Sequence, residues 1–152
     1  MTTLQFRTAT PDDIAFIVRL IAEDSVLDPI DDPARAGDDA YGSAFAAIAG
    51  NPDHMLMIAE IKGAPVGTFQ LSFLPGIARR GMWRAQIEGV HIAPEHRSRG
   101  YGGQMMQWAI DKARERGCAI VQLTSNAKRQ DAHRFYTRLG FVPSHTGFKL
   151  DI

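Results

Sequence analysis

The organisation of this chain is decided by the stretch Arg97-Ser98-Arg99-Gly100-Tyr101-Gly102-Gly103. An apolar, strand-like run ending at Pro94 precedes it, and a run with helical periodicity begins near Gly102. Glycines lack the Cβ atom that would hold a ligand away from the backbone, so successive amides can converge here on an anion at a helix N-terminus. Arg97 and Arg99 add two positive charges beside those amides. The stretch therefore predicts a phosphate-binding loop between a strand and a helix.

Two other kinds of phosphate loop do not fit these residues. A P-loop requires G-x-x-x-x-G-K-[ST], and neither Gly-Lys-Ser nor Gly-Lys-Thr occurs in the chain. The dinucleotide fingerprint G-x-G-x-x-G requires glycine at the position of Met105, and an acidic residue at the end of a second strand. The strand-like region 118–124 contains no acidic residue.

The pattern that remains is R-x-x-G-x-G, preceded at 88–94 by EGVHIAP. This combination resembles the acetyl-CoA loop of the GNAT N-acetyltransferase superfamily. Downstream, the sequence DAHRFYTRLGF at 131–141 is similar to the family segment A-x-x-F-Y-x-x-L-G-F, at the separation expected in the family. Two matched segments in the expected order make the resemblance more specific than either segment alone.

The resemblance implies a mixed α/β fold in one domain over residues 1–152. It implies a central, twisted, mostly antiparallel sheet of about seven strands, flanked by about four helices and splayed at the acyl-CoA-binding strand. The residue pattern predicts helices over 11–23, 41–49, 102–116 and 131–139. It predicts strands over 4–7, 54–61, 66–74, 82–92 and 118–124, and a final pair over 141–144 and 147–150. A four-residue turn at 62–65 is expected to join the second and third strands.

Composition limits the classes of partner and compartment. The chain has 152 residues, with 17 Lys plus Arg against 17 Asp plus Glu. The balanced charge does not favour a nucleic-acid or membrane partner. The single cysteine, Cys118, cannot form an intrachain disulfide, and the first residues lack the pattern of a signal peptide. We therefore expect a cytoplasmic protein.

The resemblance also assigns the residues that would bind acetyl-CoA. The pyrophosphate would be bound by the backbone amides of Ser98, Arg99, Gly100, Tyr101, Gly102 and Gly103, with charge from Arg97 and Arg99. Pantetheine would bond as an added strand to the backbone of Val90, His91 and Ile92. Asn126 is placed like the family's cofactor-contacting asparagine. Arg129 departs from the family pattern, because many relatives carry asparagine there.

Glu88 and Tyr136 are the candidate catalytic residues. Glu88 matches the glutamate that in many relatives deprotonates the amine, directly or through water; its alternative is a strand glutamate paired with Arg84 or another neighbour. Tyr136 matches the general acid that protonates the departing thiolate, and its alternative is a tyrosine packed beside Phe135. His91 could be a base, but a lone strand histidine beside a backbone-binding site is interpreted as structural.

These residues predict transfer of acetyl from acetyl-CoA to a primary amine of a small molecule in a direct ternary complex, with no metal. Two alternatives stay open: a protein or peptide N-acetyltransferase, and a non-catalytic acyl-CoA-binding module. The resemblance also allows a homodimer. The connector between the first two helices is rich in acids, which favours a cationic acceptor. Its aspartates are Asp24, Asp28, Asp31, Asp32, Asp38 and Asp39.

Overall fold

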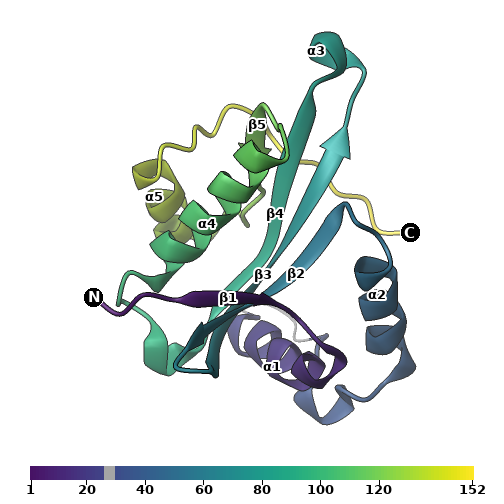
Figure 1. Ribbon diagram of the computed structural model, residues 1–152, viewed down its shortest axis with the longest axis vertical. Helices are drawn as coiled ribbons and strands as arrows, with labels where there is room; N and C mark the ends of the chain where they lie inside the picture. The colour runs from purple at the N-terminus through teal and green to yellow at the C-terminus, as the bar shows by residue number, and fades with distance from the viewer. Residues whose placement is uncertain (26–29) are drawn as a thin grey trace. The chain divides into compact units, whose positions relative to one another are not determined.

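The computed structural model describes residues 1–25 and 30–152, which form two compact units, Met1–Gln122 and Leu123–Ile152. The first unit is built on one sheet whose strands lie side by side in chain order (Figure 1). They are β1 (Gln5–Thr8), β2 (His54–Ile61), β3 (Ala64–Pro75), β4 (Trp83–Ile92) and β5 (Ile120–Gln122). Neighbouring strands are antiparallel except β4 and β5, which are parallel.

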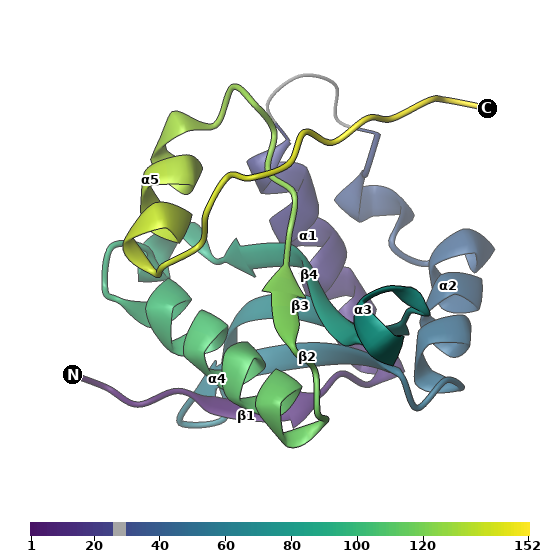
Figure 2. The ribbon, with the colours of Figure 1, turned by 90° about the horizontal axis from the view of Figure 1, so that it is seen from above.

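Helices cover both faces of this sheet. The helices of the first unit are α1 (Ile14–Asp24), α2 (Asp39–Ala49), the short α3 (Ala78–Gly81) and α4 (Tyr101–Glu115). Figures 1 and 2 show α4 on one face and α1 with α2 on the other. The predicted mixed α/β class is therefore confirmed.

The face under α4 is the apolar core. Trp108 of α4 packs between the rings of Phe6 and Phe69, with centroids 5.3 and 5.7 Å away. In β4 the buried residues Ala85 and Ile87 alternate with less buried ones, whereas β3 is buried on both faces over 66–69 and 71–73, as a central strand covered by helices on both sides would be. The fully buried residues of this layer include Phe69, Leu71, Phe73, Ala85, Ile87, Met105, Met106 and Ala109.

An ion pair with a buried carboxylate attaches the start of α1 to the edge of the sheet. The Asp13 carboxylate accepts hydrogen bonds from the Arg7 guanidinium at 2.6 and 2.8 Å and from the Thr10 amide at 2.7 Å. Arg7 also donates to Glu60 of β2 at 2.6 Å. The guanidinium bonds lower the pKa of Asp13 below its ordinary value. Thr10 and Asp13 thus form a capping box before α1, with Arg7 as an additional partner of the carboxylate.

The β2–β3 hairpin is tighter than the sequence suggested. Ile61 pairs with Ala64, so the loop consists only of Lys62 and Gly63, both with positive φ (51° and 79°). Two positive φ values in a two-residue loop match the right-handed twist of the flanking strands. The prediction of a four-residue turn was wrong by this difference.

The second unit contains α5 (Gln130–Arg138) and the C-terminal segment. The described chain has no strand at 141–144 or 147–150, where a final pair was expected, and its sheet has five strands rather than about seven. Pro143 lacks the backbone N–H that a paired strand would use. The apolar side chains of Val142, Phe148 and Leu150 are exposed, so this segment does not pack its apolar residues as a paired strand would. Within the residues that the structure describes, no helix has the length and apolar character needed to cross a membrane.

Candidate active site

Polar side chains gather on the sheet face that carries α1 and α2. Residues directly opposite in neighbouring strands point to the same face. His54, Ser72, Gln86 and Gln122 lie opposite one another from β2 to β5. The next two rows across β2, β3 and β4 are Leu56, Gln70 and Glu88, and then Ile58, Thr68 and His91. This face is apolar in β2, where it packs on α1 and α2, and polar in β4.

Two glutamine amides connect β5 to Glu88. The Gln122 amide nitrogen donates to Gln86 Oε1 at 2.8 Å, and the Gln86 amide nitrogen donates to Glu88 Oε1 at 2.9 Å. An ionised carboxylate can only accept, so the orientation of both amides follows from the charge on Glu88. We call these three residues the amide relay. Glu88 is exposed, and its second oxygen has no partner among the described residues.

The strand β4 separates from β5 where the site begins. The two strands pair only over Arg84–Gln86, so the β5-facing edge of β4 beyond Ile87 has no strand partner in the described sheet. On the other side, the β3 register shifts between Thr68 and Gln70, where β4 carries the extra residue of a β-bulge. Gly89 has φ +59° there, a conformation that glycine adopts without strain. The expected splay is present, and it leaves the backbone of 90–92 without a β5 partner in the described sheet.

The glycine-rich loop forms an open cradle of amides before α4. Ser98 (φ 60°) and Gly100 (φ 78°) take left-handed conformations, and α4 begins at Tyr101. None of the amides from 98 to 103 donates to another described residue. Arg99 is exposed and has no ion pair within the described part of the chain. Unpaired amides beside a free cation at a helix N-terminus fit a phosphate group, and the residues present therefore fit acetyl-CoA.

Arg97 already has partners in the structure, whereas both arginines were expected to be available for a phosphate. Its Nε donates to the carbonyl of Ile92 at 3.0 Å, and its Nη2 donates to Asp24 at 2.6 Å. The other oxygen of Asp24 lies 2.5 Å from Nδ1 of His91. Sequence reasoning missed this cluster because Asp24 is 67 positions from His91 and no local pattern links them. Gln86 could have been found, because a polar residue two positions before Glu88 in an apolar strand indicates the same face.

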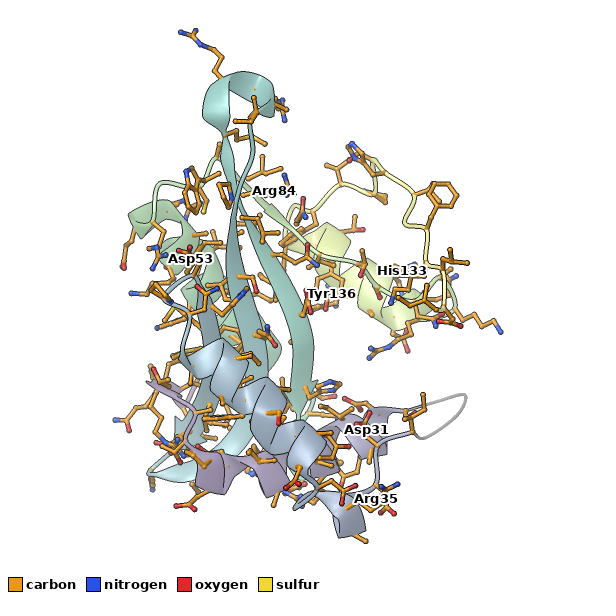
Figure 3. All side chains as sticks on the ribbon, turned by 90° about the vertical axis from the view of Figure 1, so that its right-hand side faces the viewer. Asp31, Arg35, Asp53, Arg84, His133 and Tyr136 are labelled. Carbon is orange, nitrogen blue, oxygen red and sulfur yellow. The ribbon has the colours of Figure 1, made fainter. Side chains whose placement is uncertain are left out.

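Tyr136 and Asn126 belong to the second unit. Figure 3 shows Tyr136 on α5, and its ring lies edge-on to Phe135 and Phe141 at 5.2 and 5.9 Å between centroids. Burial raises the pKa of the Tyr136 hydroxyl, partly offset by the charge of Arg129, so the phenol stays protonated at neutral pH. The Asn126 side-chain oxygen accepts from the amide two residues on at 2.9 Å, which leaves its amide nitrogen available.

The acidic connector is largely satisfied by local contacts. Asp31 accepts from the Tyr41 hydroxyl at 2.6 Å (Figure 3), and Asp38 pairs with the arginine three residues earlier at 2.7 Å. Asp32 accepts from the backbone amide two residues on at 2.9 Å. Asp28 lies outside the described residues. Asp31, Asp32 and Asp38 therefore have structural partners that do not depend on a ligand.

A sheet splayed beside an amide cradle, with a carboxylate on the open face, matches the resemblance found in the motifs. The model of the acetyltransferase (GNAT) family matches residues 19–141. The chain belongs to this family. An aminoalkylphosphonate N-acetyltransferase from Salmonella typhimurium is 30% identical over 148 residues, covering 97% of this chain and 91% of the relative.

Solved structures show the same fold. A transcriptional regulator from Bacillus halodurans superposes with a TM-score of 0.92 at 37% identity, over 98% of this chain and 99% of the other. A predicted acetyltransferase from Clostridium acetobutylicum, solved with acetyl-CoA, has a TM-score of 0.73 at 18% identity, over 98% and 96%. Across the described residues, no group of three or more His, Cys, Asp or Glu side chains is arranged to hold a metal ion.

Proposed function

We propose that this protein transfers the acetyl group of acetyl-CoA to the primary amine of a small molecule in a direct ternary complex. The observation that carries the proposal is the set of unpaired amides at 98–103 beside the splayed edge of β4. The cradle and Arg99 would bind the pyrophosphate, the backbone of 90–92 would bind pantetheine, and Asn126 would contribute a further cofactor contact. Enzymes of the GNAT family use acetyl-CoA, which supports this assignment.

Glu88 is the proposed base. An alkyl ammonium in water has a pKa of ~10.4 and cannot attack a thioester until it loses a proton. The Gln86 amide occupies one oxygen of Glu88, and the other oxygen can accept that proton, directly or through water. The free amine then attacks the thioester carbonyl, and the C–S bond breaks.

Tyr136 is the proposed general acid. The thiolate that leaves takes a proton from the Tyr136 hydroxyl, whose raised pKa keeps it a donor at neutral pH. The second proton lost by the amine nitrogen restores the balance. CoA thiolate is a fair leaving group, so this donor accelerates its loss without being indispensable.

The acceptor is proposed to be a small amine of the size of an aminoalkylphosphonate. The support is the Salmonella relative of that name, which matches nearly the whole chain. The expectation of a cationic acceptor keeps less support, because the acids of the connector have local partners. The single cysteine supports a cytoplasmic location, where disulfides are rare. A homodimer remains a hypothesis, which sedimentation would test.

The test is acetyl-CoA-dependent thiol release with a panel of aminophosphonates, amino acids, polyamines, aminoglycosides and peptides. At least one small amine should be acetylated. With it, Glu88→Gln should lower kcat by about 10²- to 10⁴-fold, and Tyr136→Phe by tenfold or more. Both variants should bind CoA like the wild type by calorimetry, whereas Gly102→Val should lose CoA binding while staying folded. Undiminished turnover in Glu88→Gln would show that this residue is not the base.

The same panel separates the two alternatives. A peptide N-acetyltransferase would acetylate only the peptides. A non-catalytic module would bind CoA and release no thiol with any amine, which would also suit the regulator from Bacillus halodurans. Glu88 on the open face and a protonated Tyr136 favour catalysis, because neither residue is needed to bind CoA through the cradle.

A further inference from the structure

We propose that His91 is a second proton acceptor on the open sheet face, oriented for this role by the carboxylate of Asp24. The inference rests on the proposed acetyl transfer and adds a residue to it. The sequence alone favours a structural interpretation of His91, with only its backbone near pantetheine. In the fold, however, the His91 ring contacts a carboxylate, which the sequence did not indicate.

The contact between Asp24 and His91 joins two distant elements. Asp24 is the last residue of α1, and His91 lies near the end of β4. Their side chains are only 15% and 14% exposed, and Asp24 Oδ2 lies 2.5 Å from His91 Nδ1. A carboxylate at a helix C-terminus opposes the helix dipole, and the contacts with His91 and Arg97 offset this cost for Asp24.

This contact decides which ring nitrogen of His91 is basic. An ionised carboxylate only accepts, so Nδ1 carries the hydrogen, and Nε2 of the neutral ring presents its lone pair. Nε2 has no hydrogen-bond partner among the described residues, and it is not one of the buried unpaired atoms. Within the described part of the chain, no donor therefore occupies its lone pair. The same arrangement orients the histidine in other acid–base pairs, where the carboxylate also stabilises the imidazolium that forms.

His91 and Glu88 are neighbours on one face. Glu88 lies opposite Gln70 and His91 lies opposite Thr68, two residues further along β3. Two residues of a strand span roughly 6.6 Å, a separation that long side chains and one water molecule can bridge. Among the described residues, Asp24 of α1 contacts the His91 ring, Arg97 from the loop after β4 shares the Asp24 carboxylate, and Glu88 lies on the same face of β4.

Acetyl transfer removes two protons from the amine nitrogen, so a second proton acceptor has a role in the reaction. An ammonium and acetyl-CoA become an amide, free CoA and one proton, and the nitrogen loses two protons in total. One proton leaves before attack, and the other leaves as the tetrahedral intermediate collapses. One of the two balances the proton given to the thiolate, and the other goes to solvent. With His91 beside Glu88, the carboxylate can pass its proton through water to Nε2 and on to solvent within each turnover.

The experiment compares His91→Gln, Asp24→Asn and Glu88→Gln with His145→Gln, a control at an exposed histidine whose ring contacts the neighbouring Ser144. We expect His91→Gln to lower kcat at least tenfold with the KM for acetyl-CoA within twofold of wild type. Asp24→Asn should give a smaller loss and move the His91 tautomer, read from ¹⁵N shifts. His145→Gln should match wild type in both kinetic parameters.

Four outcomes are informative. If His91→Gln keeps wild-type kcat and only melts earlier, the contact is a structural tie and the proposal is overturned. If His91→Gln does not fold, Asp24→Asn decides, and an unchanged tautomer and kcat in that variant overturn the proposal. A fully active Glu88→Gln with a defective His91→Gln removes Glu88 as base and leaves His91 supported. A defective Glu88→Gln with a normal His91→Gln removes His91 alone.

Discussion

Gly67 of β3 controls how closely β4 approaches at the proposed pantetheine edge. A Cβ atom at Gly67 would lie 2.9 Å from the carbonyl oxygen of His91 and 3.1 Å from the sulfur of Met105. The methionine can rotate away, but the carbonyl is backbone, so β4 itself would have to shift. Gly67→Ala should therefore destabilise the protein by about 1–3 kcal/mol, the usual cost of overpacking. For a domain of this size that is a fall in Tm of roughly 2–12 °C.

The matched control is Gly42→Ala in α2. Apart from its chain neighbours and the backbone of its own helix, no described heavy atom lies within 4 Å of a Cβ built at Gly42. The position is helical, so alanine should stabilise the protein by about 0.8–1 kcal/mol. Thermal unfolding by circular dichroism measures both variants, and calorimetry measures CoA binding. Gly67→Ala should also weaken CoA binding, because a shift of β4 would move the backbone of 90–92 that is proposed to bind pantetheine. An unchanged Tm in Gly67→Ala, or a decrease in Gly42→Ala, would refute this account of the packing.

Three further predictions follow from single contacts. Gln122→Glu is nearly isosteric but reverses the amide relay, because Gln86 would then donate to the new carboxylate instead of to Glu88. Because Glu88 loses one hydrogen bond to its charged group, kcat should fall about 10- to 100-fold. A wild-type kcat would contradict the relay. The pKa of Asp13 is lower in the folded protein than its unfolded value of about 3.9, so its ion pair stabilises the fold at pH values above that value. This contribution is lost as the pH falls through the folded pKa. Asp13→Asn should therefore be less stable than wild type at pH 7 and nearly equal to it at the acid end of a denaturation series. Burial raises the pKa of the Cys118 thiol, so alkylation at pH 8 should be slower than for a free cysteine and should accelerate above pH 9; a rate equal to that of free cysteine would contradict the burial.

The sequence predicted the parts of the fold whose pattern is local. Runs of β-favouring residues bounded by turn residues located β2 and β3, and helical spacing after the glycine loop located α4. The segment 141–150 was also predicted to form strands, but a strand needs a partner to pair with, and a partner cannot be read from a local pattern. The same limit explains the hairpin, where the register of Ile61 with Ala64 decides the loop length.

The candidate site was predictable where motifs are contiguous and unpredictable where the fold assembles it. Glu88 and the cradle lie within one stretch, so their sequence pattern was informative. The cluster of Asp24, His91 and Arg97 depends on where α1 ends over the sheet. A paired Arg97 also means that its contribution to phosphate binding must compete with Asp24, which no sequence pattern could indicate.

The bulge at Gly89 determines which side chains of β4 face the open side of the sheet. Residues three apart in a regular strand point in opposite directions, so Glu88 and His91 should face opposite sides of the sheet. The extra residue changes an odd interval into an even one, which brings both side chains to the open face while Ile87 and Ile92 both face α4. If β4 were regular here, with Gly89 and Val90 each paired to its own residue of β3, the two sets would exchange beyond that point, and the imidazole would face the core. Deleting one residue at 89 or 90 should instead remove the bulge without this exchange, because Glu88 and His91 would then be two residues apart in a regular strand.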